Sequence, residues 1–234
     1  MLRPHRSLTL IPNSGDFLNR VGLKVNMEQN SSTSNILNYD SEAVLIKLEE
    51  LLVERSTAES KIKTLYGFVA SLPLGYNRND DIAASEVLRD GYGQCNTKVT
   101  LLCALARGAG VPSRIHAYEL HKEAQRRRAP AWLVFFMPRT TMFVWPEFYL
   151  NKKWIPLQKI VATKPRAWDS CPFDGAKYQL EPLPKEWIAR DLGVWNTPDE
   201  LYAMHKPSVN GWRTIGWVLI GRRVMNSVVR KSAC

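Results

Sequence analysis

The chain has 234 residues, of which 45% are hydrophobic and 23% are charged. This length and composition exclude a wholly disordered or fibrous protein and predict one substantial hydrophobic core with peripheral extensions. The net charge of +10 favours encounters with anionic partners, but the basic residues are scattered and no nucleic-acid-binding motif accompanies them.

The four cysteines, Cys95, Cys103, Cys171 and Cys234, lie far apart and lack CxxC spacing. This spacing predicts neither a zinc site nor a dense disulfide framework, and it favours a reducing compartment. No stretch approaches the roughly 18 apolar residues of a membrane span, and residues 1–15 lack the apolar run of a secretory signal. We therefore expect a cytoplasmic protein. Because no ligand cluster or phosphate loop is present, we expect neither a metal nor an organic cofactor.

The first part of the chain predicts a polar extension followed by two helices. Residues 1–40 are polar, and we expect an irregular N-terminal extension with one short strand at residues 8–11. Apolar residues recur with a helical period over residues 41–54 and again before Pro73. Residues 56–59 have the pattern of a capping box at the start of the second helix. The two helices should pack together and cover one side of the core.

The middle of the chain changes from helical to extended patterns. Residues 74–81 have turn chemistry, residues 84–89 predict a short helix that closes at Gly91, and a longer helix begins at Cys95 and breaks after Gly108. Strands are predicted at residues 114–120, 140–150 and 154–158, the last two joined by a hairpin turn. A helix followed by antiparallel strands is an α+β arrangement.

The C-terminal part predicts a loop and three helices. Residues 162–185 are rich in proline and should form a surface loop, with short helices at 185–191 and 198–205 after it. Residues 211–231 combine apolar and basic side chains. This pattern is compatible with peripheral membrane contact but is more typical of a core-packing helix with a solvated basic face. We divide the chain into an extension (1–40), a core (41–161) and a loop and helical tail (162–234).

One cysteine lies at a junction that suits a nucleophile. The glycine-containing loop that starts at Asp90 leads through Gly91 and Gly93 into the helix that begins at Cys95. The first backbone N–H groups of a helix are unpaired and the helix dipole is positive there, so a thiolate at this position is stabilised. The stretch therefore predicts a reactive thiol at Cys95.

Three motifs in chain order resemble the bacterial branch of the transglutaminase-like superfamily. They are Gly93-Gln94-Cys95, then Gly110-Val111-Pro112-Ser113-Arg114, then Trp145-Pro146-Glu147 with Tyr149 and Trp154. The resemblance implies a papain-like fold, in which a cysteine-bearing helix packs on an antiparallel sheet, here with N-terminal helices and a helical C-terminal tail. It also implies a Cys-His-Asp triad and a small-molecule or peptide-like acyl or amide substrate.

The resemblance assigns two of the three triad positions to other residue types. It places the nucleophile at Cys95, the histidine two residues before Trp145, which is Phe143, and the acid four residues after Trp154, which is Gln158. A phenylalanine can neither take the thiol proton nor return it to a leaving group.

Three interpretations follow from these substitutions. In the first, His116 or His121 replaces the missing histidine. The two are an odd number of residues apart, so a regular strand would place at most one of them facing Cys95. Each is also compatible with a structural role.

In the second interpretation the cysteine acts by a different mechanism in a hydrophobic pocket. Phe143, Trp145 and Tyr92 would bind the substrate, although aromatic residues at alternate strand positions are also typical of a core. Gln94, with the backbone N–H of Cys95, could bind an oxyanion, and Gln158 could orient a neighbour. A specialised cyclisation or acyl-transfer step in small-molecule biosynthesis would fit such a site.

In the third interpretation the fold serves only for binding. Cys95 would then be a small apolar residue without a chemical role, and Phe143 and Gln158 favour this view.

Overall fold

The computed structural model describes residues 34–52, 57–127, 134–135, 139–160, 185–205 and 226. The helices longer than a single turn are α2 (Glu42–Leu52), α3 (Ala58–Ser71), α4 (Ala84–Asp90), α5 (Cys95–Gly108) and α9 (Pro198–Met204). The strands are β1 (Ser113–His121), β2 (Thr140–Leu150), β3 (Lys153–Pro156) and β4 (Ile188–Trp195), and the single turns are η1 (Lys122–Arg127), α7 (Leu157–Ile160) and η2 (Lys185–Trp187). The strand predicted at 8–11, the loop at 162–184 and, apart from Asn226, the helix at 211–231 lie outside the described residues.

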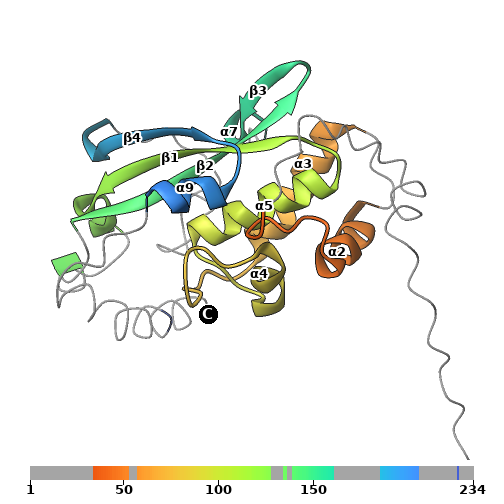
Figure 1. Cartoon of the computed structure of the whole chain (residues 1–234), viewed down its shortest axis with the longest axis horizontal. Helices are drawn as coiled ribbons and strands as arrows, with labels where there is room; N and C mark the ends of the chain where they lie inside the picture. The colour runs from red at the N-terminus through yellow and green to blue at the C-terminus, as the bar shows by residue number, and fades with distance from the viewer. Residues whose placement is uncertain are drawn as a thin grey trace, which may run out of the picture.

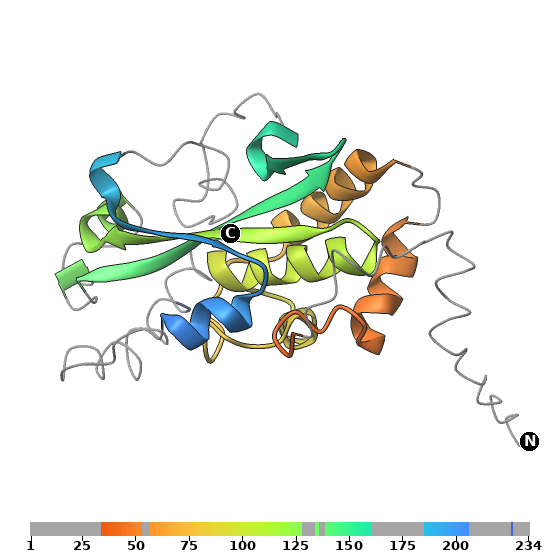
Figure 2. The ribbon, with the colours of Figure 1, turned by 45° about the horizontal axis from the view of Figure 1, so that its top comes forward.

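The four strands form one antiparallel sheet in the order β3-β2-β1-β4, with helices packed on it (Figure 1). Both views place α5 between the sheet and α4, with α2 and α3 beside it (Figure 2). This arrangement confirms the predicted α+β fold with a cysteine-bearing helix on an antiparallel sheet.

The central position of α5 follows from its sequence. Every residue from Asn96 to Gly108 is buried, as expected of a helix that is covered on all sides. Val144 and Phe148 of β2 contribute to the same core. A Cβ atom built on Gly108 would lie 2.6 Å from the Leu48 side chain and 3.1 Å from the Tyr39 carbonyl oxygen, so glycine favours the close approach of α2.

The start of α3 differs from the capping-box prediction by one residue. Thr57 is the N-cap, and its hydroxyl accepts a hydrogen bond from the Ser60 N–H at 3.2 Å. Glu59 is therefore too early in the helix to complete a box, and it pairs instead with Lys63 at 2.6 Å.

One predicted element at a sheet edge was wrong, and another was correct in kind but ends two residues earlier than predicted. The short helix predicted at 185–191 is the single turn η2 followed by β4, which pairs with β1 across two register shifts. Its sequence alternates poorly because this edge strand is largely exposed. The strand predicted at 154–158 ends at Pro156, where α7 begins, because proline cannot donate to a continuing ladder.

A buried arginine fixes the C-terminal end of α5. Arg107 is only 2% exposed, and its guanidinium donates to the carbonyl of Ser113 at 2.9 Å and to the carbonyl of Asn196. The Ser113 hydroxyl in turn donates to the Cys103 carbonyl at 3.1 Å. One side chain thus joins α5 to the start of β1 and to the link between β4 and α9.

We predict that Arg107→Met lowers the free energy of unfolding by about 3 kcal/mol, because buried carbonyl groups lose their donor while the side-chain volume is kept. Arg190→Met is the matched control, since Arg190 is exposed and its pair with Glu119 (3.0 Å) should contribute about 0.5 kcal/mol or less. Urea unfolding measures both. Equal effects of the two substitutions would contradict the anchoring role of Arg107.

Candidate active site around Cys95

Cys95 is the first residue of α5, directly after the N-cap Gln94. The thiol is partly buried and, within the described residues, is not in a disulfide. Its Sγ donates to the Asn96 Oδ1 at 3.6 Å, and the Asn96 Nδ2 donates to the carbonyl of Met142 at 3.1 Å. The start of α5 is thereby fixed against β2, one residue from Phe143.

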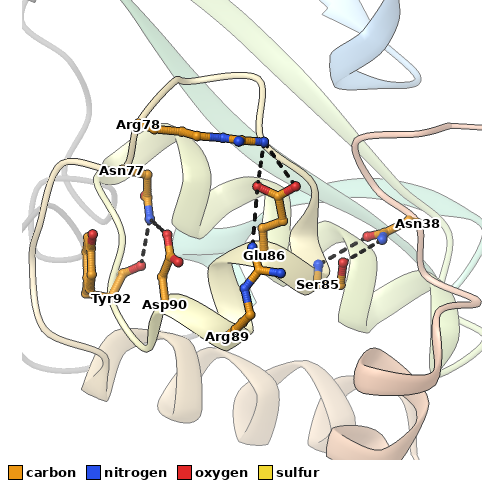
Figure 3. A network of polar contacts seen from close by, with 8 residues as sticks. All are labelled: Asn38, Asn77, Arg78, Ser85, Glu86, Arg89, Asp90 and Tyr92. Carbon is orange, nitrogen blue, oxygen red and sulfur yellow. Dashed lines mark hydrogen bonds and ion pairs between the residues drawn. The ribbon is translucent and has the colours of Figure 1, made fainter.

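The fully buried Asn77 organises the loop that carries Cys95. Its Oδ1 accepts from the Thr97 hydroxyl at 2.7 Å. Its Nδ2 donates to the Asp90 carboxylate at 2.8 Å and to the Tyr92 carbonyl at 3.2 Å, as Figure 3 shows. Its backbone N–H donates to the Gln94 Oε1 at 2.9 Å. One asparagine therefore binds both ends of the loop and the first turn of the helix.

Further polar contacts hold α4 beside this loop (Figure 3). Glu86 pairs with Arg78 at 3.0 Å, and the Asn38 side chain bonds both the hydroxyl (2.7 Å) and the backbone N–H (3.2 Å) of Ser85. The turn at residues 77–81 is thus tied to a helix as well as to the Cys95 loop.

The glycines of the motif are required by close packing. Residues 73–75 run beside Gly93, with the Gly93 N–H donating to the Pro73 carbonyl at 3.2 Å and the Gly75 N–H donating to the Gly93 carbonyl at 3.3 Å. A Cβ atom on Gly93 would lie 2.8 Å from the Thr97 Oγ1, and one on Gly75 would lie 2.5 Å from the Tyr92 ring. Tyr92, predicted to bind substrate, therefore packs its ring over Gly75.

Gln94, predicted to assist an oxyanion, already has two polar partners. Its carboxamide donates to Asp80 and accepts from the Asn77 N–H. Asp80, Asp81 and Cys95 also lie near Tyr202 of α9. Burial raises the pKa of Tyr202 well above its ordinary value, and these three groups raise it further. Tyr202 therefore keeps its proton at neutral pH.

Phe143 and Trp145, predicted to line a substrate pocket, are buried in a second hydrophobic cluster. They are 2% and 6% exposed, and they pack with Leu120 and Ala124. Cys95 and Tyr118 are among the partly buried side chains packed against this cluster. The binding role of the two aromatic residues stays a prediction. So does the orienting role of Gln158, which lies in α7 and whose side chain is outside the described residues.

Of the two candidate histidines, only His116 shares the sheet face of Phe143. His116 pairs with Trp145 in the register of β1 and β2, and His121 pairs with Thr140 at the exposed end of β1. The His116 Nε2 lies 2.8 Å from the Asp191 Oδ1, and its Nδ1 lies 3.2 Å from the Tyr118 hydroxyl. The structure thus contains a His-Asp pair on this face, one strand away from Phe143.

Local contacts set the ionisation of the groups around His116. Burial raises the pKa of Asp191, but hydrogen bonds from the Gly193 N–H and from His116 outweigh this effect and hold it below its usual value. Asp191 is therefore a carboxylate at neutral pH. The pKa of Tyr118 is raised by burial and then by the charges of Asp191 and Glu147, so its hydroxyl stays protonated.

Comparison with known proteins identifies the fold family. Residues 48–158 match the model of the transglutaminase-like superfamily. These residues form a transglutaminase-like domain. A crystal structure from Cytophaga hutchinsonii, named as a "Putative Cysteine Protease", is similar over 80% of this chain with 13% sequence identity and a TM-score of 0.46. This chain matches 49% of that protein's length. The search of curated proteins found no significant match.

The transglutaminase-like core contains functional candidates that the sequence did not reveal. Asn77 lay in a stretch interpreted only as a turn, and Asp191 lay in the segment interpreted as a helix. Asn77 bonds Asp90, 13 residues away in the chain, and Asp191 bonds His116, 75 residues away. The polar composition of the turn was the one signal available for Asn77.

Within the described residues, no group of three or more histidine, cysteine, aspartate or glutamate side chains is placed to hold a metal ion. No described helix has the length and apolar character needed to cross a membrane.

We predict that Gly93→Ala lowers the free energy of unfolding by about 1 to 3 kcal/mol, because the new methyl group must displace Thr97 from its bond with Asn77. Gly67→Ala is the control, since Gly67 lies in the exposed face of α3 with nothing within 4 Å of the added Cβ. That change should raise stability by about 0.5 to 1 kcal/mol. Thermal unfolding of both variants measures the two changes in stability. A stabilised Gly93→Ala would show that the loop has space for a methyl group at this position.

Proposed function

We propose that this transglutaminase-like protein is a cysteine-dependent enzyme that acts on an acyl or amide group, with Cys95 as its nucleophile. The observation that carries the proposal is the placement of Cys95. A partly exposed thiol begins a 14-residue helix, and its loop is fixed by a buried asparagine. A cysteine without a chemical role would not require a loop held in place by buried hydrogen bonds. A specialised cyclisation or acyl transfer on a small-molecule or peptide-like substrate fits the hydrophobic surroundings of the thiol.

The two described cysteines of α5 differ in chemical character. Cys95 lies at the positive end of the helix dipole, which favours its thiolate. Cys103 is fully buried in the same helix, and burial raises its pKa to about 11 despite the nearby Arg107 and Ser113. The helix therefore presents one reactive thiol and protects the other.

We assign the missing base to His116, which Asp191 orients. We propose that Tyr118 relays the proton, since Tyr118 and Cys95 both pack against the cluster that contains Phe143 and the Tyr118 hydroxyl lies 3.2 Å from the His116 Nδ1. In this scheme the thiol proton passes to the Tyr118 oxygen while the Tyr118 proton passes to the His116 Nδ1. The imidazolium that forms is paired with the Asp191 carboxylate.

The reaction then follows from the thiolate. Its sulfur attacks the carbonyl carbon, and the negative charge that develops on the carbonyl oxygen is stabilised by the backbone N–H of Cys95 and the Gln94 carboxamide. The proton held on His116 returns through Tyr118 to the leaving amine or alcohol as its bond to carbon breaks. The resulting thioester is resolved by a second nucleophile, which is water in hydrolysis and an amine or alcohol in transfer or ring closure.

A second candidate function is non-catalytic binding by the same fold. The burial of Phe143 favours it, because this residue occupies the place that the resemblance assigns to the histidine and packs in the cluster that Cys95 contacts. In that case the polar bonds around Cys95 would serve only to shape a surface.

The alkylation rate of Cys95 by iodoacetamide, measured against pH, separates the two functions. We expect an apparent pKa at least one unit below the free value of about 8.5. We also expect His116→Ala and Tyr118→Phe to raise that apparent pKa by about one unit, and thereby to slow alkylation at pH 7 about tenfold.

Several controls accompany this measurement. His205→Ala should leave the rate unchanged, since His205 contacts Trp195 rather than the cluster, and His121→Ala tests the other candidate base. Cys103 should remain unlabelled in the folded protein, as peptide mass spectrometry would show. An apparent pKa near 8.5 that neither His116→Ala nor Tyr118→Phe changes would favour the binding function.

The triad positions can also be tested directly. We expect the double variant Phe143→His with Gln158→Asp to gain amidase or transglutaminase activity on generic substrates, because it places an imidazole beside the helix start. Each single variant is the control for the other. No gain, in a variant that unfolds at the same urea concentration as the wild type, would show that these positions do not correspond to the triad.

A further inference from the structure

A short extended segment beside the Cys95 loop has two hydrogen-bonding edges. Its inner edge faces the loop. There the Gly75 N–H and the Pro73 carbonyl bond with Gly93, and the Asn77 N–H bonds with Gln94. The bonding groups of residues 73, 75 and 77 thus point to one side, so those of the intervening Tyr76 point to the other.

The outer edge is occupied by a side chain from the far end of the chain. The Tyr76 N–H donates to the Asn226 Oδ1 at 2.6 Å, and the Asn226 Nδ2 donates to the Tyr76 carbonyl at 3.1 Å. We call this pair of bonds the Asn226 clasp. Two residues of neighbouring antiparallel strands exchange the same two bonds. The carboxamide of Asn226 therefore occupies the position of a peptide group on this edge.

The edge lies beside the loop that carries the candidate nucleophile. Leu74 and Gly93 form an isolated parallel bridge, and Gly93 is two residues before Cys95. A chain paired to the outer edge would lie two strand spacings, or about 10 Å, from the backbone of this loop. Three extended residues span about that distance.

We propose that the outer edge of residues 73–77 is a main-chain binding site for an extended, peptide-like substrate, and that Asn226 occupies it as an internal competitor. The proposal rests on the function proposed above, and it narrows the substrate to one with a peptide backbone within about three residues of the reacting carbonyl. A substrate binds by replacing both bonds of the Asn226 clasp with its own N–H and carbonyl groups. The edge binds the main chain of the ligand, so it should accept ligands with different side chains.

The test compares a small and an extended alkylating agent on the full chain. The small agent is iodoacetamide and the extended agent is N-acetyl-trialanyl chloromethyl ketone. With either one, the Cys95 thiolate displaces a halide ion and forms a thioether. Asn226→Ala should raise the rate with the extended agent about tenfold and leave the rate with iodoacetamide unchanged, because only the extended agent competes for the edge. Asn79→Ala, an exposed asparagine in the same loop, is the matched control and should change neither rate.

Two results would overturn the proposal. One is an unchanged ratio of the two rates in Asn226→Ala. The other is an equal acceleration with both agents, which would mean that the Asn226 clasp only stiffens the loop.

A second measurement does not depend on the thiol. In Cys95→Ala combined with Asn226→Ala, N-acetyl-trialanine amide at millimolar concentration should slow hydrogen exchange at the Tyr76 amide about threefold or more, as measured by NMR. No protection would refute the binding edge. Protection together with an unreactive Cys95 in the wild type would refute the enzymatic function and keep the edge.

Discussion

The site depends on the burial of one carboxamide. A buried amide must satisfy all of its donors and acceptors within the protein, and Asn77 does so with Asp90, the Tyr92 carbonyl and Thr97. These partners come from both sides of Cys95. The position of the thiol is therefore determined less by the helix that it begins than by a turn that precedes it by 18 residues. Gly93 permits this arrangement because any side chain there would occupy the space of Thr97.

Polar bonds at both ends of α5 specify how a mostly apolar core is assembled. Arg107 holds the C-terminal end to β1 and to the β4-α9 link, and Asn77 and Asn96 hold the N-terminal end. Between them, the buried Lys98 donates to the Leu72 carbonyl at 2.6 Å. Apolar burial supplies most of the stability of such a core, whereas satisfied buried polar groups select one orientation among many that would bury similar area.

The sequence predicted the elements whose pattern is local. The helices at α2, α3, α4, α5 and α9 followed from period and capping, and β1, β2 and the hairpin followed from β-branched and aromatic residues. The edge strand β4 was missed because its exposed residues lack alternation, and its existence depends on pairing with β1. The resemblance located Cys95 and the positions of Phe143 and Gln158. It could not reveal the pair of His116 with Asp191, since Asp191 lies in a segment predicted as a helix and its position in β4 depends on the register shift between Ala117 and Tyr118.

The late position of β4 in the chain has a consequence for the order of folding. The contacts that fix Cys95 span about 20 residues or fewer on the Asn77 side, whereas His116 meets Asp191 only across 75 residues and Arg107 meets Asn196 across 89. Closing long loops is slower than closing short ones. During synthesis the cysteine loop can therefore form well before β4 joins the sheet. A nascent or truncated chain would then carry its thiol and His116 without the Asp191 carboxylate that is proposed to orient this histidine, so that full activity would require the complete sheet.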